Sequence, residues 1–221
     1  MRAITKIRVK YSKNRDVCML SHLEVVAIVK NSVEKSGLPV CLRGENKKLC
    51  IAFGPPLPVG YSSLCELFDV EMQQRVEPES AKQAFSKNIP SGFEVKSVYG
   101  VPVFSPPVDT AVNAAEYMVS NLKNIENGDL KIREFYSKNE YLIERITDKS
   151  AHTIDVRPLV KEIKFVENGI FLLLRFGPKR TIKPDVLIPK IFSLNEEQKM
   201  SMRIERIAFY CEKEDGVLRS V

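Results

Sequence analysis

Residues 4–11 decide the beginning of the fold, and they read Ile4-Thr5-Lys6-Ile7-Arg8-Val9-Lys10-Tyr11. Apolar and basic side chains alternate along this stretch. Successive side chains of a strand point to opposite faces of a sheet, so the alternation predicts a strand with one face buried and one basic face in water. The fold is therefore expected to open with a half-buried β-strand.

The rest of the first half has a regular order. Ser21 has the side chain of a helix N-cap, Glu24 follows as in a capping box, and the helical spacing of apolar residues ends at Gly37. The later elements expected are short strands at 38–42 and 49–53, a stiff proline-rich loop at 54–60, a strand at 64–72, a helix at 78–88 and a strand at 93–98. This order is typical of a ferredoxin-like, split βαβ domain.

The second half begins after a proline-rich stretch. Residues 101–113 contain three prolines and lack periodicity, which favours a linker. Beyond it we expect strands at 116–122, 141–147, 154–157, 163–166, 170–176 and 202–212, with helices at 130–137 and 185–192. The prediction is an α+β protein with two ferredoxin-like antiparallel-sheet domains in tandem, residues 1–100 and 114–221, joined by 101–113.

Composition places the chain among folded proteins. Its 221 residues are 44% hydrophobic and 28% charged, close to the averages for globular domains. The sequence lacks an apolar run of the roughly 20 residues that span a bilayer, and its first residues are charged. We therefore expect a cytoplasmic protein without a membrane partner. Five cysteines, an odd number, favour reduced thiols over a disulfide framework.

The sequence predicts neither a metal site nor a bound cofactor. Cys41 and Cys50 are the nearest pair of cysteines, whereas an iron-sulfur cluster of the radical SAM type needs three closely spaced thiolates. The two histidines, His22 and His152, lie far apart, and the cysteines lack the short spacing of zinc ligands. Glycines occur singly, so the sequence lacks a phosphate-binding loop.

Basic residues are the most suggestive feature for binding. The net charge is +6 with a pI near 9.0, and Lys6, Arg8 and Lys10 should share one face of the first strand. The candidate contacts to nucleic-acid phosphates are Lys6, Arg8, Lys10, Arg43, Lys47, Lys48, Arg175, Lys179, Arg180 and Lys183. RNA is thus a candidate partner, although an ordinary solvated basic face has the same pattern, and stacking aromatics are not evident on the first strand.

Three residues are candidates for chemistry. His22 lies at a helix N-terminus, where an imidazole can act as an acid, a base or an anion contact, but a structural histidine packed on the apolar stripe explains it as well. Asp155 and Arg157 should point the same way from one strand, either as a structural ion pair or as part of a site. An enzyme would have to bring these residues together in space.

Several motifs resemble a known family. They are Leu20-Ser21-His22-Leu23-Glu24, Ile51-Ala52-Phe53-Gly54-Pro55-Pro56-Leu57-Pro58-Val59-Gly60, Ile154-Asp155-Val156-Arg157-Pro158-Leu159-Val160, Arg175-Phe176-Gly177-Pro178, Lys183-Pro184-Asp185 and Arg206-Ile207-Ala208-Phe209-Tyr210. In this order they are similar to the radical SAM-linked protein family, over nearly the whole chain. The resemblance implies a bacterial protein that works beside, or is fused to, a radical SAM enzyme.

One loop departs from the family pattern. Where the family usually has an aromatic, an asparagine and a histidine-proline pair, this chain has Arg43-Gly44-Glu45-Asn46-Lys47-Lys48. A change there marks either a lost function or a specialised one.

These features support three functional hypotheses. The first is a non-catalytic accessory module that presents a substrate, with RNA as the candidate, to a partner radical SAM enzyme. The second is an RNA-modifying or RNA-processing enzyme on a duplicated ferredoxin-like fold, and the third is a purely structural scaffold.

Overall fold

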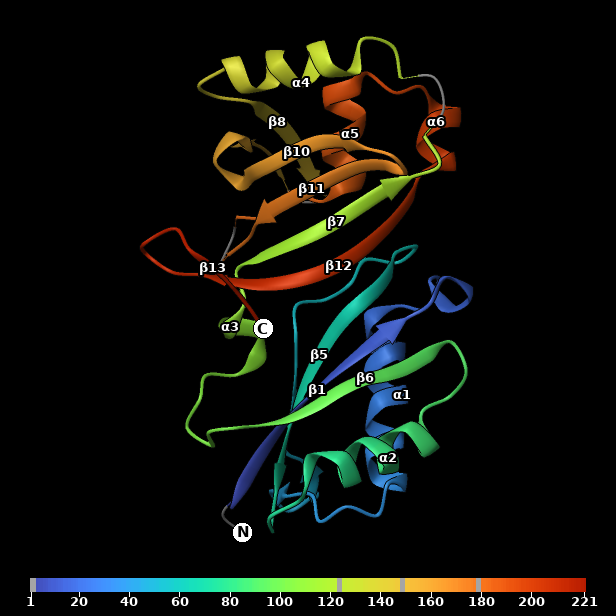
Figure 1. The fold of residues 1–221 in the computed structure, drawn as a ribbon, viewed down its shortest axis with the longest axis vertical. Coiled ribbons are helices and arrows are strands. Elements are labelled where there is room, and N and C mark those ends of the chain that lie inside the picture. The colour runs from blue at the N-terminus through green and yellow to red at the C-terminus, as the bar shows by residue number, and fades with distance from the viewer. Residues whose placement is uncertain (1–2, 123–124, 148–149, 178–179) are drawn as a thin grey trace. The chain divides into compact units, whose positions relative to one another are not determined.

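The computed structural model describes residues 3–122, 125–147, 150–177 and 180–221, and of residues 145–147 and 150–152 it describes only the backbone. The chain divides into two compact units, Met1–Val112 and Asn113–Val221 (Figure 1). Both units combine helices with an antiparallel sheet, so the fold is α+β as expected. In the described parts of the chain, the helices fall short of the length and apolar character needed to cross a bilayer.

The first unit is built around four strands. Its elements are β1 (Thr5–Lys13), η1 (Arg15–Val17), α1 (His22–Lys35), β2 (Leu42–Arg43), β3 (Lys48–Leu49), β4 (Ile51–Phe53), β5 (Ser62–Met72), α2 (Pro78–Asn88), β6 (Phe93–Val101) and α3 (Val108–Ala111). The sheet order is β4-β5-β1-β6, with antiparallel neighbours. The short strands β2 and β3 form a separate hairpin.

Helices α1 and α2 supply the core on one face of this sheet. Ile7 and Val9 of β1 pack in a cluster of buried residues with Val29 of α1 and Phe85 of α2. The predicted capping box is confirmed, because the Ser21 side chain accepts from the Glu24 backbone and Glu24 accepts from Ser21 in return. The predicted helix at 78–88 has the bounds of α2.

The opposite face of the sheet differs from the prediction. Lys6 and Arg8 are each only 6% exposed, although alternation placed them in water. The segment after β6 explains this, because Ser105 accepts a hydrogen bond from Lys6 Nζ and α3 contacts β4 and β5. Val108 of α3 is fully buried. Part of the stretch expected to be a linker therefore packs on the basic face of the sheet.

The second unit has a five-stranded sheet. Its elements are β7 (Ala114–Ser120), α4 (Gly128–Ser137), β8 (Leu142–Thr147), β9 (Ser150–Asp155), η2 (Arg157–Leu159), β10 (Val160–Val166), β11 (Gly169–Arg175), α5 (Pro184–Phe192), α6 (Glu196–Ser201), β12 (Arg203–Glu212) and β13 (Leu218–Ser220). The sheet order is β10-β11-β7-β12-β13, again antiparallel. Strands β8 and β9 pair with each other.

Two local predictions for this unit are corrected. The strand expected at 154–157 ends at Asp155, and Arg157 begins the 3-10 turn η2. Helix α6 was not expected. Its signal in the sequence is Asn195 with Gln198 three residues later, which forms a capping box in the structure. Short helices with few apolar residues escape a search for apolar periodicity.

The two units share one strand order. In the first unit the order is β6-β1-β5-β4. In the second it is β12-β7-β11-β10, with β13 added outside β12. Numbered along the chain, the four strands lie in the order 4-1-3-2 in both units.

Candidate anion-binding site

A cavity of about 320 Å³ lies in the first unit beside the β2–β3 hairpin. Three basic residues predicted from the sequence, Lys6, Arg43 and Lys48, line it together. The other lining residues are Leu49, Cys50, Ile51, Ala52, Asp69, Glu71 and Pro107. The hairpin, strands β1, β4 and β5, and the segment before α3 therefore converge on this cavity, which we call the basic pocket.

A buried ion pair supports the sheet beside the basic pocket. Arg8 Nε lies 2.7 Å from Asp69 Oδ1, and Arg8 Nη2 lies 2.9 Å from Asp69 Oδ2. The two residues are directly opposite in the β1–β5 register, and their side chains are 7% and 3% exposed. Burial opposes the charge of Arg8, but the hydrogen bonds and negative charge of Asp69 raise its pKa. Arg8 therefore neutralises Asp69 rather than offering itself to a phosphate.

Two cations of the basic pocket, Arg43 and Lys48, are closer to solvent than Arg8, whereas Lys6 is as buried as Arg8. Arg43 Nη2 lies 2.7 Å from Glu71 Oε2, and the Arg43 side chain is 70% exposed. Lys48 is also exposed. Lys6 Nζ donates to the Ser105 carbonyl at 2.6 Å. An ammonium group carries three donors and a guanidinium five, so each of these cations can still bind an anion.

The charges around the basic pocket sum to a positive value. Lys6, Arg43 and Lys48 contribute three positive charges, and Arg8 behind them contributes a fourth. Asp69 and Glu71 contribute two negative charges, both already paired with arginines. Burial raises the pKa of the Cys50 thiol, so this part of the lining stays neutral near pH 7. The arrangement suits an anion such as a phosphate.

The remaining predicted basic residues are dispersed. Lys10 is half-buried on β1, and Lys47 is exposed in the hairpin turn. Arg175 is engaged by Glu212, with Nε–Oε2 and Nη2–Oε1 distances of 2.6 and 2.7 Å. Arg180 and Lys183 are exposed in the second unit, whereas Lys179 lies outside the described residues.

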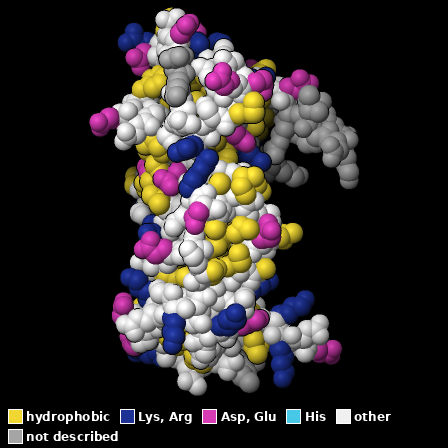
Figure 2. Space-filling model, turned by 90° about the vertical axis from the view of Figure 1, so that its right-hand side faces the viewer, with side chains coloured by type: hydrophobic (Ala, Val, Ile, Leu, Met, Phe, Trp, Pro, Cys, Tyr) yellow, Lys and Arg dark blue, Asp and Glu magenta, His cyan; other side chains and the backbone are white. Residues whose placement is uncertain are grey.

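One side of the surface shows a mixed charge pattern. In Figure 2, basic and acidic side chains are interspersed, with hydrophobic side chains grouped between them. The side drawn in Figure 2 therefore shows mixed charge and not one broad basic face.

Glu212 forms a structural cluster with Arg175 and Lys161. Lys161 also contacts Glu212, at 2.6 Å, and donates to the Gly216 carbonyl, which joins β10 to the β12–β13 turn. The hydrogen bond from Arg175, followed by that from Lys161, lowers the pKa of Glu212 from its ordinary 4.5 to about 2. Arg175 therefore serves the second sheet.

The three candidate catalytic residues have local structural contacts. His22 packs edge-on against Phe53, with ring centroids 6.4 Å apart. Asp155 Oδ1 accepts hydrogen bonds from the backbone N–H groups of Tyr141 and Arg157, at 2.9 and 3.0 Å. The Asp155 side chain therefore holds the turn into η2, where the sequence predicted that it would point the same way as Arg157 from one strand.

Arg157 is held by aromatic rings. Its guanidinium carbon lies 4.9 Å from the Tyr136 ring centroid and 5.4 Å from that of Phe135. This stacking fixes η2 against α4 and is worth about 0.5–2 kcal/mol in proteins generally. The Asp155–Arg157 motif is thus accounted for by packing in the second unit, while His22 belongs to the first.

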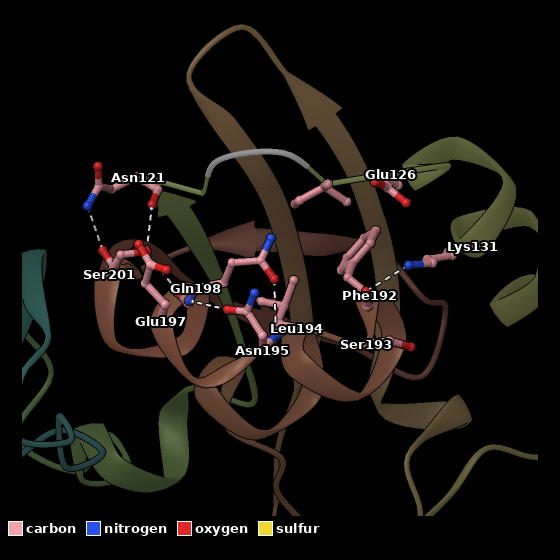
Figure 3. Close-up of a pocket in the computed structure, with 11 residues that line it drawn as sticks. Asn121, Glu126, Lys131, Phe192, Ser193, Leu194, Asn195, Glu197, Gln198 and Ser201 are labelled. Carbon is pink, nitrogen blue, oxygen red and sulfur yellow. Dashed lines mark hydrogen bonds between the residues drawn. The ribbon is translucent and has the colours of Figure 1, made fainter.

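A larger cavity, of about 500 Å³, lies in the second unit near α6 (Figure 3). Several of its polar side chains bond to neighbouring backbone groups. Lys131 Nζ donates to the Phe192 carbonyl at 2.8 Å, Asn121 Nδ2 donates to the Ser201 carbonyl at 2.7 Å, and Asn195 accepts from the Gln198 backbone. These three side chains hydrogen-bond to backbone groups at the ends of α5 and α6. We call this cavity the polar pocket.

Within the part of the chain that the structure describes, three or more His, Cys, Asp or Glu side chains do not gather as metal ligands would. Sequence reasoning missed the contributions of Asp69, Glu71 and Pro107 to the basic pocket. The position of Asp69 between the apolar residues Phe68 and Val70 was the available signal for a buried partner of Arg8.

Comparison with known proteins gives a family and a distant structural likeness. None of the curated proteins matches the chain. A chain in the solved structure described as "Crystal Structure of a Cbf5-Nop10-Gar1 Complex" is similar at 13% sequence identity, with a TM-score of 0.45, over 96% of this chain and 51% of that chain. The sequence matches the family described as "Uncharacterized protein conserved in bacteria (DUF2344)" over residues 6–184. That match spans most of the sequence, and the chain therefore belongs to this bacterial family, DUF2344.

Proposed function

We propose that this protein is a non-catalytic accessory module that binds RNA through the basic pocket and presents it to a partner radical SAM enzyme in the bacterial cytoplasm. The observation that carries the RNA-binding part is the convergence of Lys6 of β1 with Arg43 and Lys48 of the β2–β3 hairpin on one cavity. Contacts from lysine and arginine to phosphates supply most of the sequence-independent affinity of proteins for nucleic acids.

The accessory role is supported by the contacts of the candidate catalytic residues. His22 packs on Phe53, Asp155 holds a turn, and Arg157 stacks on aromatic rings. Each side chain thus has a role in the fold. The partner enzyme is proposed from the sequence resemblance, and the basic pocket includes Arg43 and Lys48 of the loop in which this chain departs from the family pattern.

We also infer that the two units are split βαβ domains related by duplication. The shared 4-1-3-2 order of antiparallel strands is the order of that topology. Phe53-Gly54 lies at the end of β4, the second strand of its unit, whereas Phe176-Gly177 follows β11, the third, so this inference rests on strand order and not on these dipeptides.

The RNA part is tested by binding total cellular RNA across a salt series. The variant Arg43→Gln/Lys48→Gln removes two exposed cations from the basic pocket. If both contact phosphates, the slope of log affinity against log salt falls by roughly 1.4 to 1.8. A matched control is Lys30→Gln/Lys35→Gln, which removes two exposed charges from α1, on the other face of the sheet. The control should keep the slope of the original protein.

Two results would count against the proposal. Equal slopes for the pocket variant and the α1 control would remove the basic pocket from RNA binding. The absence of RNA binding at low salt would remove RNA altogether. The partner is tested separately, by retrieving the tagged protein from its bacterium and assaying the bound fraction for a radical SAM enzyme; recovery without one contradicts that part.

A further inference from the structure

Phe104 is the starting point for an inference that rests on the proposed RNA binding and deepens it. Among the large hydrophobic side chains of the described residues it is the most exposed, at 91%. A single exposed apolar residue is common on protein surfaces and needs no explanation by itself. What distinguishes Phe104 is the place at which the chain holds it.

The loop that carries Phe104 is anchored at the basic pocket. Ser105 N–H donates to the Pro102 carbonyl at 2.9 Å, which closes a turn around Phe104. The Ser105 carbonyl accepts from Lys6 Nζ at 2.6 Å, and Pro107 lines the basic pocket. The loop then ends in α3, whose Val108 is fully buried. The aromatic ring therefore sits one residue from a direct contact to a pocket lysine.

This juxtaposition matches the needs of an unpaired nucleotide. Cations bind the phosphate, and an exposed ring offers its face to a base. In a duplex the base faces are covered by their neighbours, so only an unstacked base can lie on such a ring. The basic face of β1 has no evident aromatic residue on which a base could stack. Phe104 supplies such a ring from a distant loop, in which Ser105 is 99 positions from Lys6.

We propose that the basic pocket and Phe104 form one site for single-stranded RNA, in which Lys6, Arg43 and Lys48 hold phosphates and a base stacks on Phe104. The site selects flexible or looped RNA over duplex RNA. Base selectivity is low, because stacking accepts every base.

The experiment compares binding of a fluorescein-labelled oligouridylate of about twelve nucleotides with an RNA duplex of the same length, near the site size of a single-strand binding fold. The variants are Phe104→Ala, Phe104→Trp and the pocket variant Arg43→Gln/Lys48→Gln. Because Phe104 is exposed, the first two should fold as the original protein does. Loss of one stacked base weakens binding about 5- to 150-fold.

The expected pattern separates stacking from charge. Phe104→Ala should weaken oligouridylate binding but keep the salt slope, whereas the pocket variant should reduce the slope. The sequence contains no tryptophan, so Phe104→Trp introduces a single indole reporter. Its fluorescence should be quenched by oligouridylate, and its affinity should match or exceed that of the original protein.

Each other outcome overturns the inference in a distinguishable way. If Phe104→Ala binds normally while the pocket variant fails, RNA binding stands and the stacking role is wrong. If duplex binds as tightly as oligouridylate, selection of single strands is wrong. If Phe104→Ala loses only a protein partner, the ring is a protein anchor. If the original protein binds neither RNA, the proposed function fails with it.

Discussion

The basic pocket of the first unit and the polar pocket of the second are built on the same strand order but use polar side chains differently. In the basic pocket, Arg43 and Lys48 reach solvent while their carboxylate neighbours are already paired. In the polar pocket, Lys131, Asn121 and Asn195 are bonded to helix ends and loop backbone. Several polar groups of the larger cavity therefore serve the fold, and the proposed RNA site is the smaller cavity.

The difference arises from one connecting segment in each unit. In the first, the chain after β6 crosses the sheet and leaves a pocket over charged residues of β1 and β5. In the second, the chain after α5 forms α6, and the Asn195 side chain at the polar pocket caps the start of this helix. Variants that remove one side chain at a time can test which residues of the two pockets bind RNA and which stabilise the fold.

The largest effect is expected from breaking the ion pair beside the basic pocket. Arg8→Met leaves the Asp69 carboxylate buried without its counter-charge, which should lower the free energy of unfolding by about 3 to 5 kcal/mol. Urea denaturation measures this. The matched control is Arg43→Met, which breaks the exposed pair with Glu71 and should cost at most about 1 kcal/mol. If the two variants lost similar amounts of unfolding free energy, burial would not determine how much each ion pair contributes to stability.

A smaller effect is expected at Glu212 in the second unit. Its pKa in the folded state, about 2, lies below its ordinary 4.5. The ionised carboxylate therefore stabilises the fold fully above pH 4.5, and this contribution is lost as the pH falls toward 2. Glu212→Gln should cost about 1 to 2 kcal/mol at pH 7, because water screens its partly exposed partner Arg175.

Urea denaturation of both proteins between pH 7 and pH 2 measures the Glu212 effect. The gap between the original protein and Glu212→Gln should close as the pH falls. A gap that is constant with pH would mean that the side chain acts through packing instead of charge.

The polar pocket predicts a capping effect. Asn195→Ala removes the side-chain acceptor for the Gln198 N–H and should destabilise the second unit by about 1 kcal/mol. Thermal unfolding measures it, and Ser21→Ala, which removes the cap of α1 in the first unit, is the matched comparison. Loss of RNA binding in Asn195→Ala without loss of stability would reverse the roles assigned to the two pockets.

The smallest effect is expected for Lys131→Gln in RNA binding. Its ammonium group is engaged at the C-terminal end of α5, so its removal should leave RNA affinity within about twofold of the original and cost at most about 1 kcal/mol of stability. The salt-series assay used for Arg43→Gln/Lys48→Gln provides the measurement. A drop in slope equal to one lost phosphate contact would place RNA in the second unit as well.

Local signals in the sequence predicted most elements of the fold. Proline at the start of α2 and the Ser21–Glu24 box mark helix ends through backbone chemistry that acts within a few residues. A hairpin-like connection between two apolar runs was also predicted, but the strands expected at 38–42 and 49–53 are shorter in the structure, at Leu42–Arg43, Lys48–Leu49 and Ile51–Phe53. A local sequence pattern does not show which surface a segment distant in sequence will bury. The alternation in β1 therefore cannot show that residues after β6 pack over Lys6.

The candidate site was predictable only in part. Lys6, Arg43 and Lys48 were singled out as cations, but their grouping depends on long-range packing. The orientation of Arg157 was predicted wrongly because alternation was extended past Asp155, the last residue of β9. Arg157 begins the 3-10 turn η2, and its guanidinium lies over the ring of Tyr136. Phe104 lies in a stretch without periodicity, so its exposure was evident only from the structure.

The opposed positions of Arg8 and Asp69 also bear on how the chain finds its fold. A slip of β1 against β5 by one residue would turn the apolar side chains away from the helices, and so it is excluded by the core. A slip by two residues would keep the faces correct and cost little in apolar contacts. In one direction such a slip would place the buried Arg8 opposite Leu67, and in the other direction it would place Arg8 opposite Glu71 and Asp69 opposite Lys10. The Arg8–Asp69 pair thus disfavours the slip that would leave Arg8 facing Leu67, a slip that hydrophobic packing alone would tolerate.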